Sequence, residues 1–165
     1  MEETAYHESG HIVIAGAVGL DIKIKGIVIY EVEGVADGWA FYWEDNQQWA
    51  GILMALRAGQ LAQLKQFPDS EFRGGQRDVQ NFFSMVQEHF LPSSGGDVWQ
   101  DISTATNRKL DTHWATVESV ADAAMKATWI PVTVAEHPDA KRKKHLDGNT
   151  LVEILAKHKI TTRVR

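Results

Sequence analysis

His7, Glu8 and His11 form the pattern His-Glu-x-x-His near the start of the chain. On a helix, residues four positions apart lie on one face, a turn from each other, so both imidazoles would reach one metal ion. Glu8 follows the first imidazole directly, where its carboxylate can face a water held by that ion. Zinc with three protein ligands lowers the pKa of such a water to about 7, and a carboxylate base then takes its proton during attack on a carbonyl. The pattern indicates a metal-dependent hydrolytic site.

The alternative to a metal site is a surface helix that carries two solvated histidines and one glutamate. An apolar run, Ile12, Val13 and Ile14, follows the motif directly and would bury the helix. A buried helix favours a metal site over two solvated histidines.

The third ligand has to be a histidine or a carboxylate, because the chain contains no cysteine. Glu31 and Glu33 lie in strand-like sequence beside a turn, and Glu44 and Asp45 lie in turn-like sequence. Asp78 is a better candidate, since it falls in the first turn of a predicted helix. The same position is typical of an acidic residue that complements the helix dipole. The residue types alone therefore leave the third ligand open.

Composition excludes several other classes of protein. The 165 residues are 44% hydrophobic and 24% charged, which is typical of one globular domain. The net charge of -5 argues against binding to nucleic acid or to an anionic membrane surface. The metzincin pattern would need glycine and histidine where the chain has Ile14 and Ala17. No Walker motif, apolar span or targeting segment is found, so we expect a cytoplasmic protein without an ATPase module of its own.

The hydrophobic pattern predicts an α+β fold, mainly helical with a small sheet, in one domain of residues 1–165. A catalytic α+β part (1–90) begins with the His-Glu-x-x-His helix, and a helical part (97–165) follows the linker-like segment 91–97. We expect helices at 3–18, 46–66 and 74–90, strands at 21–33 and 39–43, a long helix from 97 to 127 broken near Asp111, and a last helix at 150–159. The basic run 141–144 is predicted to be a solvated loop.

Five segments resemble the peptidase domain of the FtsH-type membrane-anchored AAA proteases. TAYHESGHIVIAG (4–16) resembles the helix in which that family carries His-Glu-Ala-Gly-His. GVADGWAFYWED (34–45) resembles the turn and strand after it, and LMALRAGQLAQ (53–63) resembles its Leu-Ala-Gly-Arg-Ala-Ala helix. FRGGQRDVQNF (72–82) resembles the segment that ends in the third zinc ligand, and HLDGNTLVEIL (145–155) resembles part of its terminal helix.

This resemblance implies a zinc metalloendopeptidase in which His7, His11 and Asp78 hold Zn²⁺ and Glu8 is the catalytic base. It also implies a substrate-binding edge strand that lays an extended polypeptide beside the metal. That strand comprises Trp39, Ala40, Phe41, Tyr42 and Trp43. The alternative is a core strand whose aromatic side chains are simply buried.

The chain departs from the family where Ser9 replaces the usual alanine, where Gln76 and Arg77 precede Asp78, and where the ATPase module is missing. A free-standing domain would cut unfolded or flexible polypeptides, either alone or with an ATPase acting in trans. The family also forms six-fold rings, so a homo-oligomer is implied. Two alternatives stay open: a catalytically silent peptidase-like module that binds or regulates other proteins, and a different small hydrolase whose third ligand is not Asp78.

Overall fold

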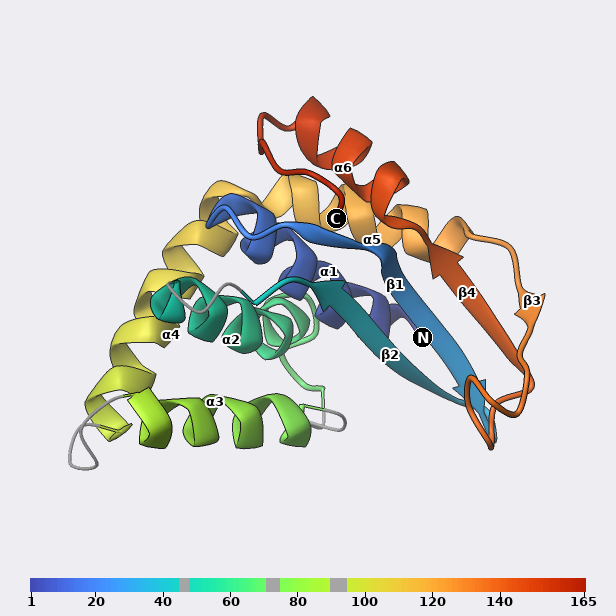
Figure 1. Ribbon diagram of the computed structural model, residues 1–165, viewed down its shortest axis with the longest axis horizontal. Helices are drawn as coiled ribbons and strands as arrows, with labels where there is room; N and C mark the ends of the chain where they lie inside the picture. Colours follow the sequence, from blue (N-terminus) through green and yellow to red (C-terminus); the bar gives the residue numbers. More distant parts are fainter. Residues whose placement is uncertain (45–47, 71–74, 90–94) are drawn as a thin grey trace.

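Figure 1 shows a computed structural model of the chain, which describes residues 1–44, 48–70, 75–89 and 95–165. The described part is mainly helical with one four-stranded sheet, which confirms the expected α+β class. In chain order the elements are α1 (Glu2–Ala17), β1 (Ile22–Val32), β2 (Val35–Tyr42), α2 (Trp49–Gln66), α3 (Gln76–His89), α4 (Gly95–Thr112), α5 (Trp114–Lys126), β3 (Ile130–Pro131), β4 (Arg142–Leu146) and α6 (Gly148–Lys157). None of these helices is both long and apolar enough to span a bilayer.

The sheet is antiparallel, with the strand order β2-β1-β4-β3, so β2 is one of its edges. Glu33 and Gly34 form the two-residue turn between β1 and β2, with φ angles of 49° and 83°. Two positive φ angles are the signature of a type I′ turn, whose twist matches that of the flanking strands. Because this turn is so short, β2 begins at Val35, earlier than the predicted start at Trp39.

Strand β4 corrects the prediction that the back half is purely helical and that residues 141–144 form a solvated loop. It pairs with β1 on one side and with β3 on the other. Each basic side chain finds a partner: Arg142 pairs with Glu31, Lys143 pairs with Glu136, and buried Lys144 donates to the Met125 carbonyl. A run of charged residues can therefore occupy an inner strand, a possibility that the sequence pattern concealed.

The predicted helix boundaries hold to within about two residues, except that α2 begins at Trp49. Helix α4 begins at Gly95, so the end of the expected linker is helical, whereas the expected break near Asp111 is confirmed at His113. Thr4 lies inside α1 and donates to the Ala36 carbonyl. Residue 46, where the second helix was expected to begin, lies outside the described residues.

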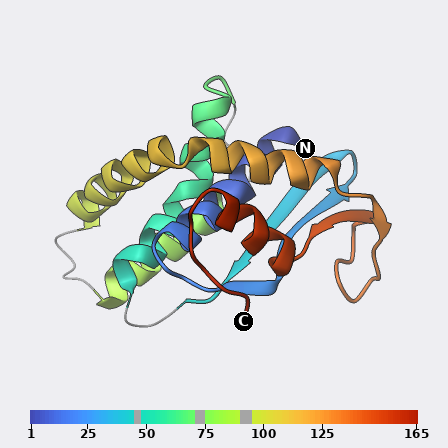
Figure 2. The ribbon, with the colours of Figure 1, turned by 90° about the horizontal axis from the view of Figure 1, so that it is seen from above.

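Helix α1 lies at the centre of the fold and is buried from Ala5 to Gly16. It packs against α2, α5 and the sheet, and Figure 2 shows α5 crossing over it. Gly10 makes the contact with α2 close, because a Cβ there would lie 2.6 Å from the Ala58 carbonyl oxygen and 2.7 Å from the Ala62 Cβ. His7 and His11 flank this glycine on α1 and are therefore pressed against α2.

Candidate metal centre

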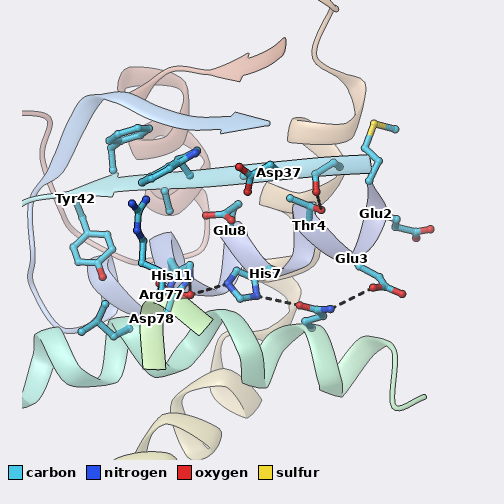
Figure 3. Close-up of a pocket in the computed structure, with 18 of the residues that line it drawn as sticks. Glu2, Glu3, Thr4, His7, Glu8, His11, Asp37, Tyr42, Arg77 and Asp78 are labelled. Atoms are coloured by element: carbon cyan, nitrogen blue, oxygen red, sulfur yellow. Dashed lines mark hydrogen bonds and ion pairs between the residues drawn. The ribbon is translucent and has the colours of Figure 1, made fainter. Parts of the chain in front are cut away.

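Three side chains from two distant segments converge at one point beside α1 (Figure 3). His7 and His11 come from successive turns of α1, and Asp78 comes from the first turn of α3. The Oδ2 atom of Asp78 lies 3.1 Å from His7 Nε2 and 3.3 Å from His11 Nε2. Their potential ligand atoms all lie within 4.8 Å of one another. The geometry brings the carboxylate of Asp78, which the resemblance implied as the third ligand, to the two histidines.

The other nitrogen of each imidazole is occupied by a hydrogen bond. His7 Nδ1 donates to the side-chain oxygen of Gln63 at 3.1 Å, and His11 Nδ1 donates to the Ala55 carbonyl at 2.7 Å. The Gln63 amide is oriented by its own donor nitrogen, which faces Glu3 and Ser70. Such bonds fix which ring nitrogen carries the proton, leaving a lone pair on each Nε2.

These residues fit a divalent cation. Each Nε2 lone pair faces the same Asp78 oxygen, itself an acceptor, so the contact needs positive charge between or on the groups. Tetrahedral zinc with bonds near 2.0–2.2 Å separates its ligand atoms by roughly 3.3 Å, close to both distances here. The donor set of two imidazoles and one carboxylate is one that zinc accepts.

Gly59 on α2 keeps space open in front of the two histidines. A Cβ at this position would lie 2.3 Å from His11 Nε2 and 2.7 Å from His7 Nε2. Only glycine leaves room there for an ion, although glycine weakens the interior of a helix. Gly59 is therefore part of the candidate centre although it offers no ligand atom.

The protonation states follow the same geometry. Burial raises the pKa of Asp78, but when the histidines are protonated the charge of His11 and the hydrogen bonds that both rings donate outweigh it and hold that pKa far below its usual range. Burial lowers the pKa of His11, whereas Asp78 and the Ala55 hydrogen bond raise it above its usual value on balance. The carboxylate of Asp78 is thus ionised, and its negative charge attracts a cation to the cluster.

Glu8 lies next to the three ligands without joining them, and it is 5% exposed. Burial raises its pKa to about 8; the charge of His7 and a hydrogen bond from the Ala40 N–H oppose this rise, whereas Asp78 adds to it. Strand β2 makes room for the carboxylate at Gly38, where a Cβ would lie 2.6 Å from Glu8 Oε1. Glu8 is therefore held between α1 and the edge strand.

A cavity of about 1000 Å³ opens over this cluster. Its walls include the start of α1, strand β2 and the start of α3, and its lining includes His7, Glu8, His11 and Asp78. An extended chain could enter it and reach the candidate metal position.

The predicted substrate strand, Trp39 to Trp43, lies along this cavity, and all but Trp43 line it. Trp39 is 36% exposed and Trp43 is 42% exposed, whereas Tyr42 is buried. Strand β2 is thus an edge with one buried and one open face, not a core strand whose aromatic side chains are all buried. Its binding of substrate stays a prediction.

Comparison of the chain with models of known protein families and with curated proteins finds no match. The assignment of the site therefore depends on its own geometry and chemistry. The resemblance to FtsH-type peptidase domains stays a prediction.

Sequence reasoning missed Gln63, Gly59 and Gly38 as parts of the site. A glycine inside a helix rich in alanine and leucine was the available signal for Gly59. Gln63 carried no signal, because its hydrogen bond to His7 spans 56 residues of sequence. Of the rejected third ligands, Glu31 pairs with Arg142 on the sheet, and Glu44 lines the cavity without joining the ligand group.

We predict that Gly59→Ala abolishes metal binding, because its Cβ would lie against both Nε2 atoms. Alanine favours a helix interior by about 0.5–1 kcal/mol over glycine, so a loss of metal would not come from a weakened helix. The matched control is Gly51→Ala on the same helix, whose Cβ would meet Val18 at 3.1 Å and no histidine. Elemental analysis after dialysis should find about one zinc per chain in the control and almost none in Gly59→Ala. Full zinc content in Gly59→Ala would contradict the assignment.

We also predict that Gln63→Leu weakens zinc binding by about 10–100-fold, because His7 Nδ1 loses its acceptor. The same change at Gln66, three residues later on α2, is the control. Competition against a coloured chelator measures both dissociation constants. Equal affinities for the two variants would show that Gln63 does not orient His7.

Proposed function

We propose that the chain is a zinc metallopeptidase that hydrolyses peptide bonds in unfolded or flexible polypeptides. The observation that carries the proposal is the convergence of His7, His11 and Asp78, with Glu8 beside them, in an open cavity along an edge strand. Burying charged groups costs free energy unless they are paired or hold a metal, so this cluster needs either protonated histidines or a bound cation.

Zinc is the metal proposed, and His7, His11 and Asp78 would hold it. Three protein ligands leave a further coordination position, which is the arrangement of catalytic rather than structural zinc sites. When bound, zinc would supply Lewis acidity, which activates a water for attack and polarises the scissile carbonyl. The hydrogen bonds of Gln63 and Ala55 to the imidazoles are the outer-shell contacts that such sites use.

Glu8 would act as the proton carrier. Its carboxyl group is buried beside the ligands but outside the ligand group, and a cation bound there would favour its ionised form. The ionised carboxylate would then accept a proton from the attacking water. It would then deliver that proton to the nitrogen of the leaving amine. The hydrogen bond from Ala40 and the close approach of Gly38 hold Glu8 against β2, so the proton is exchanged beside the edge strand.

The edge strand β2 supports a polypeptide as substrate. Strand addition would satisfy the backbone of an extended chain and would tolerate many sequences. Folded proteins would resist cleavage, because their backbone is already paired. The resemblance to FtsH-type peptidase domains supports the same substrate class, and with it an ATPase acting in trans, a homo-oligomeric ring and a cytoplasmic location.

We predict that Glu8→Gln keeps the zinc and slows cleavage of casein by at least about 10²-fold, the usual contribution of a general base. Glu153→Gln on the exposed face of α6 is the matched control and should cleave at the rate of the wild type. Release of peptides is followed by fluorescence, and zinc content is measured on the same samples.

Two other results would decide against the proposal. Equal cleavage by the wild type and Glu8→Gln would show that the activity belongs to a contaminant or to another site. A wild type that holds zinc but cuts no unfolded protein would favour the peptidase-like binding or regulatory module.

A further inference from the structure

Arg77 bridges the two walls of the cavity next to the candidate metal centre. It belongs to the first turn of α3 and directly precedes Asp78. Its guanidinium lies 4.4 Å from the ring centre of Trp39 on β2, and both residues line the cavity. Figure 3 shows the side chain reaching from α3 towards the edge strand. A positive charge is thereby fixed where an extended substrate would pass.

The charge of Arg77 is not used within the described part of the chain. The neighbouring carboxylate of Asp78 is turned to the two histidines, and no described carboxylate forms an ion pair with Arg77. Stacking on an aromatic ring occupies the face of a guanidinium and leaves its N–H edges free. Arg77 therefore presents an unfilled set of donors to the cavity.

We propose that Arg77 is a specificity-determining residue that binds a carboxylate of the substrate close to the scissile bond. The planar fork of arginine matches a carboxylate with two parallel hydrogen bonds. In a polypeptide, that group is an aspartate or glutamate side chain or the C-terminal carboxylate. The inference rests on the proposed function and adds a preference that backbone pairing with β2 would not give.

The competing role for Arg77 is purely structural, as a strut that holds α3 against β2 through its contact with Trp39. Arginine on the face of tryptophan contributes about 0.5–1 kcal/mol at an exposed site, enough to stabilise this contact. A strut would affect thermal stability and would leave the choice of cleavage site unchanged. Charge reversal separates the two roles, because only carboxylate binding predicts a change in the charge of the preferred substrate.

The first experiment compares matched peptides and maps the cleavage sites in a mixture of denatured proteins. The wild type should enrich aspartate and glutamate at one subsite, Arg77→Gln should lose this enrichment, and Arg77→Glu should replace it with lysine and arginine. Peptides that differ only by glutamate or glutamine at that subsite should differ by about tenfold or more in kcat/KM for the wild type. Peptides with a free or an amidated C-terminus test the second source of the carboxylate.

The control variant is Arg142→Gln. Arg142 belongs to β4, does not line the cavity and, like Arg77, stacks on a tryptophan ring, that of Trp129. The cleavage profile of this variant should match that of the wild type. Zinc content is measured for every variant, so that a change of preference is not confused with a loss of metal.

The second experiment measures binding without cleavage. Zinc-loaded Glu8→Gln is titrated with the labelled glutamate and glutamine peptides, with and without Arg77→Gln, and fluorescence anisotropy is recorded. The glutamate peptide should bind about tenfold more tightly only when Arg77 is present.

The outcomes are distinguishable. Cleavage that depends on Glu8 but shows no acidic preference overturns the role of Arg77 and leaves the proposed function standing. Binding that depends on Arg77 without any cleavage supports the carboxylate site and overturns the peptidase. An Arg77→Gln variant that melts earlier but keeps the preference overturns the inference in favour of the strut.

Discussion

The candidate centre depends on one constraint: two imidazole nitrogens and a carboxylate oxygen, all acceptors, face one another at hydrogen-bond distance. His7 donates its Nδ1–H to the side-chain oxygen of Gln63, and His11 donates its Nδ1–H to the Ala55 carbonyl. As long as the rings are neutral, their Nε2 lone pairs therefore meet Asp78 without a proton to share. A cation removes this conflict, and a divalent metal does so while keeping both histidines neutral.

Close packing at three glycines allows the two histidines, Asp78 and Glu8 to lie together. Gly10 lets α1 approach the backbone of α2, Gly59 clears space in front of the histidines, and Gly38 lets β2 pass over Glu8. None of these positions has room for a Cβ, so each holds glycine although glycine weakens the interior of a helix or strand. The same contacts place the edge strand, the base and the ligands along one cavity, which links the fold directly to the chemistry proposed for it.

The local parts of this site could be predicted from the sequence. The helical period places His7 and His11 on one face of the helix. The position of Glu8 follows from its place directly after His7 in the sequence. Asp78 is 71 residues from His7, and its position in a predicted helix made it a candidate that only the resemblance favoured over an ordinary acidic residue at a helix start. Gln63 could not be found, because a side-chain amide is recognised as an outer-shell contact only once its partner is known.

In the fold, too, the elements that depend on local sequence could be predicted, whereas a strand that depends on distant partners could not. The helices and the β1–β2 hairpin follow from hydrophobic periodicity and turn chemistry. Strand β4 was missed, because its basic residues find cross-strand and loop partners that the pattern does not reveal. Glu31 and Glu136 neutralise Arg142 and Lys143, so β4 is an inner strand although its sequence is typical of a loop.

A crystal structure of the zinc-soaked protein, with an anomalous difference map recorded at the zinc edge, tests the central claim most directly. The account predicts one strong peak bonded to the Nε2 atoms of His7 and His11 and to the carboxylate of Asp78, with Glu8 close by but not bonded. A peak elsewhere, or none at full zinc exposure, would contradict it.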